Sequence, residues 1–209
     1  MIDALGADIS PAQEVCALAE AKARDVARGL IAELQKHHEE SGAAASPGPH
    51  RYVVVGSDSM LEIGGRMVGK PHSAQVAVER IREMRGQDAT LWTGHCVILI
   101  CSDHRVNDAG QTHDATHQAD DANAWHQCGE FTEPAATIVH FGQMSDAEID
   151  AYVATGEPLE VAGSFTIDAL GGPFIEGVTG DPHAVVGLSL PLMRKLVNRF
   201  GIQWPELWG

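Results

Sequence analysis

The sequence predicts a single α/β domain, and three observations support that class. A chain of 209 residues is long enough to bury a sizeable core. Apolar residues make up 44% and charged residues 21% of it, the proportions of an ordinary globular protein. Apolar runs with strand composition alternate with stretches of helical periodicity, and no linker divides residues 1–209.

The charge balance excludes two classes of partner. The formal net charge is −15, from 29 acidic and 14 basic residues. A field of that sign repels nucleic acid and anionic membranes, so we expect neither to bind. No apolar run approaches the roughly 18 residues needed to cross a bilayer. A nucleotide would also be repelled, so a phosphate site needs a local positive pocket, helped by a divalent cation.

Cysteine usage and the N-terminal composition predict a cytoplasmic protein. The four cysteines, Cys16, Cys96, Cys101 and Cys128, lie far apart without CxxC spacing. This favours reduced thiols over a disulfide framework or a zinc site. The N-terminus has neither a basic region nor an apolar region of the signal-peptide kind, so we expect no secretory signal.

The first element is a predicted helix from Ser10-Pro11 to about Leu34, because proline is favoured at the first helical position. Its apolar stripe has a period of 3.6 residues and consists of Val15, Leu18, Ala19, Val26, Leu30 and Leu34. Lys22 lies on the same stripe, so it must snorkel, pair with an acid or reach into a site. Residues 36–50 are polar and contain proline and glycine, which predicts a solvated loop.

A strand and a turn within residues 53–71 form the main candidate site. The run Val53–Val55 has the composition of a buried strand and ends in small residues around Asp58. A buried parallel strand with an acid at its carboxyl end is how open α/β sheets present catalytic groups. Lys70 follows between Gly69 and Pro71, so we expect a cation near that acid, as a metal-bound phosphate requires. The alternative is a hairpin of two strands whose charges are solvated.

The remaining elements follow from periodicity and capping signals. We expect helices over 73–85, 145–156 and 189–200, strands over 91–101, 131–141 and 174–178, and a turn at 180–183. Within the strand over 91–101, His95 is expected to be a packed or hydrogen-bonded residue rather than a ligand.

Residues 102–130 are unusually polar and carry five aspartates and four histidines. His113 and His117 have the i, i+4 spacing that would suit a metal on a helix. No apolar face supports a helix there, so we expect a partly disordered insertion on a hairpin. A histidine-dependent metalloenzyme built on residues 104–126 remains the alternative.

Read in order, these motifs resemble the Maf family of nucleotide pyrophosphatases. The pieces that carry the resemblance are Leu18-Ala19, Lys22-Ala23, Asp58-Ser59, Gly69-Lys70-Pro71, Trp92-Thr93-Gly94, Thr137 with Val139, Tyr152 with Gly156-Glu157-Pro158, Ala162-Gly163-Ser164-Phe165, Gly180-Asp181, and Val186 to Pro191. The resemblance implies an inosine-triphosphatase-like mixed sheet with flanking helices and two lobes around a nucleotide cleft. It also implies hydrolysis of nucleoside triphosphates to the monophosphate and pyrophosphate, with Mg²⁺ or Mn²⁺ as cofactor.

The resemblance assigns roles to five residues of this chain. Asp58 matches the family's proton acceptor, and we expect it also to be the metal ligand. Lys22 and Lys70 match lysines at the phosphate end of the substrate, and Ser59 and Asp168 fall where members differ according to the base. Water attack on the α-phosphorus needs such a carboxylate, together with cations on the phosphoryl oxygens.

The chain departs from the family pattern at its start. Members begin with a strand and a Ser-x-Ser-Pro-Arg-Arg turn that clamps the phosphates, and nothing before Ser10 matches either. Either an upstream segment exists or the clamp is lost, and loss would favour a non-catalytic nucleotide-binding or regulatory protein. The segment 162–168 also departs from the form typical of thymidine and uridine triphosphatases, so we expect a broader or a different base preference, with non-standard or modified nucleotides among the candidate substrates. A homodimer stays open.

Overall fold

One antiparallel sheet organises the molecule, a computed structural model that describes residues 9–41, 50–102 and 125–208. The strands are β1 (Arg51–Ile63), β2 (Arg66–Val68), β3 (Asp88–Ser102), β4 (Trp125–Phe141) and β5 (Ile175–Thr179). Their order is β2-β1-β3-β4-β5. The α/β class and the flanking helices are confirmed, whereas every strand pair among the described residues is antiparallel rather than mixed.

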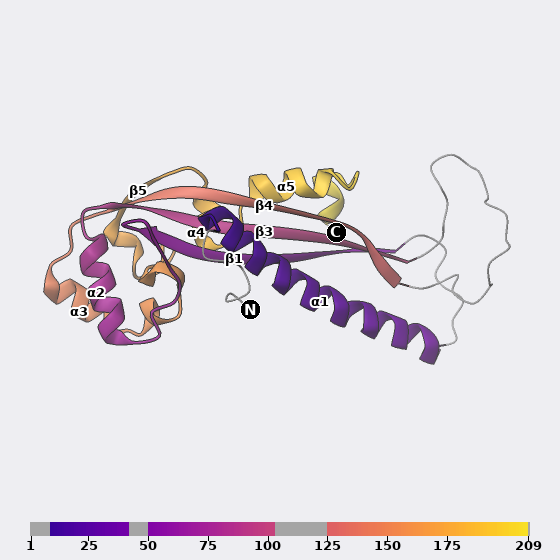
Figure 1. Cartoon of the computed structure of the whole chain (residues 1–209), viewed down its shortest axis with the longest axis horizontal. Coiled ribbons are helices and arrows are strands. Elements are labelled where there is room, and N and C mark those ends of the chain that lie inside the picture. Colours follow the sequence, from indigo (N-terminus) through magenta and orange to yellow (C-terminus); the bar gives the residue numbers. More distant parts are fainter. Residues whose placement is uncertain (1–8, 42–49, 103–124, 209) are drawn as a thin grey trace.

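Helices cover both faces of this sheet (Figure 1). They are α1 (Pro11–Ser41), α2 (Ala74–Met84), α3 (Asp146–Ala154), α4 (Pro182–Val186) and α5 (Leu190–Asn198). The indigo α1 runs along one face, while the yellow α5 lies on the opposite side and α2 and α3 sit together at one end. Among the described residues, no helix combines the length and the apolar character needed to span a membrane.

The packing of α1 depends on two glycines of the sheet, which have no side chain to keep the helix away. A Cβ added to Gly56 would lie 2.3 Å from the carbonyl oxygen of Ala19, and one added to Gly94 would lie 2.1 Å from that of Val15. The helix backbone therefore rests directly on β1 and β3. Its buried row is Val15, Ala19, Ala23 and Ala27, and the prediction that Val26 packs inward is wrong, because that side chain is 57% exposed.

The opposite face of the sheet carries two apolar clusters. Strand residues such as Leu61, Leu91 and Val139 pack against α2 and α3. Further along, Val97 and Leu99 pack against α5. Because strand side chains alternate between faces, β1 and β3 each send one set of residues to α1 and the other set to these clusters.

Several boundaries differ from the expectations for physical reasons. Helix α1 continues to Ser41, beyond the predicted end at Leu34, because no glycine or proline occurs between Leu34 and Gly42. The expected turn at 180–183 instead starts a helix, since Asp181 caps α4 by accepting a hydrogen bond from the His183 amide. The predicted capping box is confirmed, with Ser145 and Glu148 exchanging hydrogen bonds at the start of α3.

The expectation of reduced thiols is wrong for one pair of cysteines. Cys101 near the end of β3 and Cys128 near the start of β4 form a disulfide, with their Cα atoms 6.0 Å apart. Their separation of 27 residues in sequence hides the contact, which arises from the pairing of the two strands. Of the predicted 102–130 insertion, residues 125–130 belong to β4, and residues 103–124, with His104, His113 and His117, lie outside the described residues.

Candidate functional site

Strand β1 presents consecutive site residues to opposite faces of the sheet. Asp58 is the eighth of its thirteen residues and lies opposite Gly94 of β3. The expected placement of Asp58 at the carboxyl end of a parallel strand is therefore wrong, because β1 is antiparallel to both neighbours. Asp58 shares the α1 face with Gly56, and Ser57 and Ser59 point to the other face.

On the α1 face, Lys22 and Asp58 form an ion pair. The Lys22 ammonium donates hydrogen bonds to the Asp58 carboxylate and, over 3.1 Å, to the carbonyl oxygen of Ser57. Ala23, the buried residue next to Lys22 in the chain, packs against Gly56. The close approach of α1 at Gly56 therefore brings Lys22 level with Ser57 and Asp58 on β1. Of the three fates predicted for Lys22, the structure shows pairing with an acid. The two side chains stay accessible, at 57% for Lys22 and 19% for Asp58.

The Lys22 contact also marks an open edge of β1. Strand β2 pairs only with the end of β1, from Leu61 to Ile63. Before Leu61, no described strand pairs with that edge, and Lys22 reaches the Ser57 carbonyl there. A ligand that extends past this edge would meet groups from both faces of β1.

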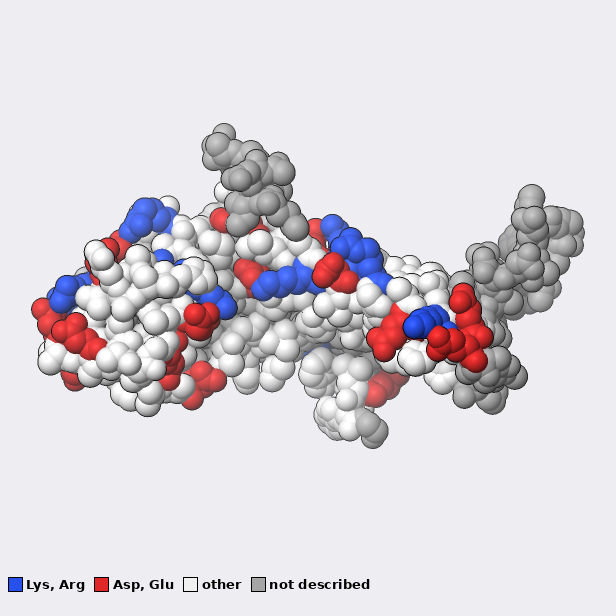
Figure 2. Space-filling view, turned by 90° about the horizontal axis from the view of Figure 1, so that it is seen from below, with Lys and Arg blue, Asp and Glu red and all other residues white. Residues whose placement is uncertain are grey.

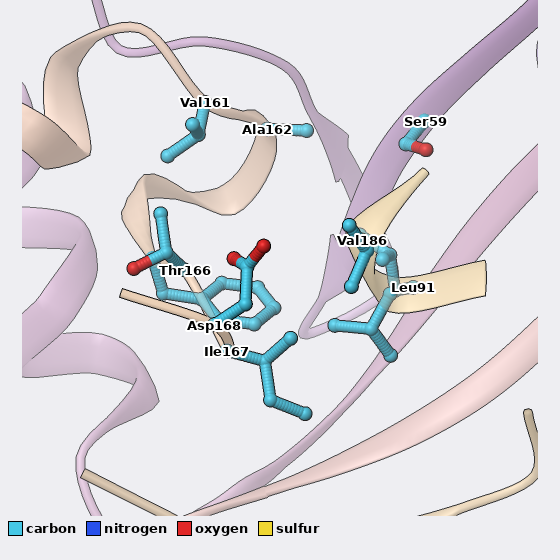
Figure 3. A pocket seen from close by; sticks show the side chains of 10 residues that line it. Ser59, Leu91, Val161, Ala162, Thr166, Ile167, Asp168 and Val186 are labelled. Atoms are coloured by element: carbon cyan, nitrogen blue, oxygen red, sulfur yellow. The ribbon is translucent and has the colours of Figure 1, made fainter. Parts of the chain in front are cut away.

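The other face of β1 contributes to a pocket of about 180 Å³. Its lining comes from β1, β3, α4 and the segment 161–168 (Figure 3): Ser59, Leu91, Val161, Ala162, Phe165, Thr166, Ile167, Asp168, Val185 and Val186. In Figure 3 the Asp168 carboxylate points into the space between the 161–168 segment and Val186. Two residues predicted to contact the base, Ser59 and Asp168, thus line one pocket, whereas Lys22, Asp58 and Lys70 do not line it.

Hydroxyl groups of the strands hold α4 against the pocket. Thr93 shares a hydrogen bond of 2.9 Å with Ser59 and donates one of 3.0 Å to the carbonyl oxygen of Ala184. Ser57 donates one of 2.6 Å to the carbonyl oxygen of Gly187. These bonds bracket Val185 and Val186, which form that wall of the pocket. Neither Ser57 nor a role for Thr93 was predicted from the sequence, although the Trp-Thr-Gly motif was a signal for Thr93.

His95 of β3 also supports the pocket wall formed by α4, because it binds the residue Ser189 that follows this helix. Its Nε2 accepts a hydrogen bond of 2.8 Å from the Ser189 amide, and the Ser189 hydroxyl donates one of 2.5 Å to Asp181. Burial lowers the pKa of His95, so its imidazole is neutral. The expectation that His95 is a buried, hydrogen-bonded strand residue is confirmed.

Lys70 lies beside the segment that forms the opposite wall. The carbonyl oxygen of its neighbour Gly69 accepts hydrogen bonds from the Gly163 amide, at 3.3 Å, and from Arg80, at 2.5 Å. Arg80 also donates to the Ser164 hydroxyl, and burial lowers its pKa. The Lys70 ammonium is 3.9 Å from Glu160, just before the pocket-lining residues. Arg80 thus fastens the Lys70 turn to the pocket wall, a role that sequence reasoning missed.

The charged groups of the site are spread out rather than gathered into a cluster. Lys22 with Asp58 lies on one face of the sheet, and Lys70 lies beyond the pocket. On the face shown in Figure 2, basic and acidic side chains are interspersed without a large basic patch. Within residues 9–41, 50–102 and 125–208, no group of three or more His, Cys, Asp or Glu side chains could hold a metal ion.

Comparison with known proteins decides the family. A family model described as Maf-like protein matches residues 3–200. The chain belongs to the Maf family. This Maf-family chain is 41% identical, over 206 residues, to a nucleoside triphosphate pyrophosphatase of Rhodococcus erythropolis, covering 99% of this chain and 80% of the relative. A protein of the same name from Rhodococcus opacus is 42% identical over 209 residues, which is the whole chain and 81% of that relative.

A third Maf relative shows the same domain in a larger context. A nucleoside triphosphate pyrophosphatase/Nudix hydrolase fusion protein of Bifidobacterium longum is 43% identical over 165 residues. The match covers 79% of this chain and 28% of the fusion protein. The resemblance drawn from ordered motifs is therefore confirmed over nearly the full length of the chain.

Proposed function

We propose that this Maf-family chain hydrolyses nucleoside triphosphates to the monophosphate and pyrophosphate. The names of its relatives support this activity. The observation that carries the proposal is the adjacency of two unlike sites on β1. Ser59 opens into a pocket, and its neighbour Asp58 forms an accessible ion pair with Lys22.

The pocket suits the nucleobase. Leu91, Ile167 and Val186 offer apolar surface for the faces of a planar ring, and the Ser59 hydroxyl and Asp168 carboxylate offer polar atoms for its edge. An ionised carboxylate only accepts hydrogen bonds, so Asp168 would favour a base edge that presents N–H donors. Pocket shape and this carboxylate together would set the base preference.

The phosphate end would then extend past the open edge of β1 towards Asp58. A water molecule oriented by Asp58 attacks the α-phosphorus, the new P–O bond forms as the bond to the bridging oxygen breaks, and pyrophosphate leaves. Asp58 takes the proton from that water. Lys22 and Lys70 offset the charge on the phosphoryl oxygens, Lys22 exchanging part of its pairing with Asp58 for the substrate.

The residues present are compatible with a divalent cation that arrives with the substrate. Mg²⁺ commonly binds through one or two carboxylates together with substrate phosphates and water. Of the five predicted site residues, only Asp58 and Asp168 carry a carboxylate. Asp168 lines the pocket, so the accessible Asp58 is the side chain that would hold the cation. Mg²⁺ or Mn²⁺ there would supply positive charge for the phosphoryl oxygens.

A non-catalytic nucleotide-binding protein is the second candidate. The observation in its favour is that the Lys22 ammonium already engages the Asp58 carboxylate, the group that would have to orient the attacking water. In such a protein the pocket would still hold a nucleotide, but the α-phosphorus would not be attacked.

Pyrophosphate release from a panel of nucleoside triphosphates, with Mg²⁺ or Mn²⁺ and with a chelator, tests both candidates. We expect metal-dependent release that Asp58→Asn lowers by at least about a hundredfold, since a positioned general base typically contributes that much or more. Asp25→Asn is the matched control, because Asp25 forms an exposed ion pair with Arg28 on the same helix. Nucleotide binding without pyrophosphate release would favour the non-catalytic protein.

A further inference from the structure

The carboxylate of Glu157 receives four hydrogen bonds beside the pocket. Glu157 starts a short helical turn just after α3. Its Oε1 accepts from the Tyr152 hydroxyl at 3.1 Å, the Thr166 hydroxyl at 2.5 Å and the Gly171 amide at 3.1 Å. Its Oε2 accepts from the Leu170 amide at 3.2 Å. One side chain therefore joins α3 to both ends of the loop 166–171.

That loop carries part of the pocket wall. Thr166, Ile167 and Asp168 line the pocket, and Glu157 itself does not. The loop closes tightly, because the Gly171 amide also donates to the Thr166 hydroxyl and a Cβ at Gly171 would lie 2.6 Å from the Thr166 carbonyl oxygen. The Glu157 bonds thus hold the loop at both ends, with Ile167 and Asp168 between the two points of attachment.

The electrostatics of Glu157 favour this role. Burial raises the pKa of its carboxyl, but hydrogen bonds from Thr166, Leu170, Tyr152 and Gly171 outweigh burial and leave the pKa below its usual value. The group is therefore ionised at neutral pH, and hydrogen bonds to an ionised acceptor are about twice as strong as neutral ones. A neutral replacement would weaken every attachment at once.

We propose that Glu157 is a positioning residue for base selection. It fixes the loop 166–171 in the shape that presents Ile167 and Asp168 to the base, without touching substrate. This inference rests on the proposed function, in which the pocket holds the nucleobase of a nucleoside triphosphate. The four hydrogen bonds of the Glu157 carboxylate involve no residue of α1 or β1, so Lys22 and Asp58 should keep their geometry when Glu157 changes.

Substitution of Glu157 should therefore alter selection among bases more than the rate of the chemical step. Glu157→Gln keeps the shape and Oε1 but turns an N–H₂ group towards the Leu170 amide, so two donors face each other. We expect the ratio of kcat/KM between the best and the worst base to fall about tenfold, the worth of one base-edge hydrogen bond. The change should appear in KM, with kcat for the best base within about twofold of the wild type.

The experiment measures kcat and KM for a panel of triphosphates with the wild type, Glu157→Gln and Glu157→Ala, and follows amide exchange at Leu170 and Gly171. Glu148→Gln is the control, because Glu148 also accepts hydrogen bonds at one end of α3 but lies away from the pocket. The inference is supported if the Glu157 variants show a smaller ratio of kcat/KM between the best and the worst base and faster amide exchange at Leu170 and Gly171, and if Glu148→Gln shows neither change. If Glu157→Ala does not fold, the Gln variant decides.

Two results would overturn the inference alone, and a third would overturn both the inference and the proposed function. Equal loss of activity on every base would make Glu157 a structural residue only, and an unchanged ratio with unchanged KM would remove it from base selection. In both cases the wild type still releases pyrophosphate, so the proposed function stands. If the wild type releases none from any triphosphate, the proposed function fails and the inference fails with it.

Discussion

The two faces of β1 at Asp58 and Ser59 are built by different means. On the α1 face, one ion pair depends on how closely a helix approaches the sheet. On the pocket face, hydroxyl groups of the strands and the Glu157 carboxylate hold short segments by many hydrogen bonds. Under the proposed function, helix packing would position Lys22 and Asp58 at the phosphate end, and loop hydrogen bonding would position the base end.

This difference has a direct consequence for substitutions. A change on the α1 face should alter turnover to the same extent for every base. A change on the pocket face should alter the ranking of bases.

The largest effect is expected from filling the contact between α1 and β3. Gly94→Ala would place a methyl group 2.1 Å from the Val15 carbonyl oxygen, a backbone atom that cannot rotate away. We expect a loss of about 3 kcal/mol in the free energy of unfolding, measured by denaturant titration. Gly29→Ala is the control, because nothing lies within 4 Å of its added Cβ, and there we expect a gain of up to about 1 kcal/mol. Equal free energies of unfolding for Gly94→Ala and the wild type would show that α1 does not rest on Gly94.

Removing the cation of the α1 face should come next. Lys22→Met keeps the length of the side chain but takes the ammonium from Asp58 and from the phosphates. We expect kcat to fall about a hundredfold by the same factor for every base, as for other groups that stabilise developing charge. Arg28→Met, which removes an exposed partner of Asp25 on the same helix, should leave kcat unchanged. A loss confined to some bases would contradict the separation of the two faces.

A smaller, base-dependent effect is expected on the pocket face. Ser59→Ala removes the hydroxyl that pairs with Thr93 and faces the pocket. We expect kcat/KM to change by about tenfold for some bases and by less than about twofold for others, since only bases that use this hydroxyl lose a hydrogen bond. The same steady-state panel that tests Lys22→Met measures it. A uniform change would instead assign Ser59 to the phosphate end.

The smallest effect concerns pH and belongs to the pocket face alone. Burial lowers the pKa of His95 in the native state. In the unfolded chain the imidazole takes up a proton near pH 6.5, whereas in the native state it stays neutral at that pH. Stability should therefore be full above that pH and should decline as the pH falls below it, by at most about 1.4 kcal/mol per pH unit. Urea unfolding at pH 7.5 and 5.5 measures the decline, which His95→Asn should reduce. An equal decline in the variant would exclude His95 as its source.

Local sequence patterns predicted much of this arrangement, and the pairing of distant segments accounts for the rest. Periodicity placed Lys22 near the core side of α1, but its contact with Asp58 depends on which strand lies under the helix. The run Val53–Val55 predicted a buried strand, yet an apolar run does not record the direction of its partners, so Asp58 was expected at a strand end. Ser59 and Asp168 came from family positions, and they do line one pocket.

Other parts of the molecule left weaker signals in the sequence. The pairing of Cys101 with Cys128 follows from strand register, which spacing in the sequence does not reveal. Glu157 stood within a recognised motif, but its four donors come from α3 and from the loop 166–171, and only the folded chain brings them together. The roles assigned to Lys22, Asp58 and Lys70 remain predictions.

The two glycines beneath α1 also limit how this protein can diverge. An α-helix rises about 1.5 Å and turns by about 100° per residue, so a slide of one residue along the sheet would carry Lys22 away from Asp58. Gly56 and Gly94 receive the helix backbone at two fixed points, which opposes any such slide. Insertions and deletions between Val15 and Ala23 of α1 should therefore be selected against, because they would move the helix backbone off one of the two glycines.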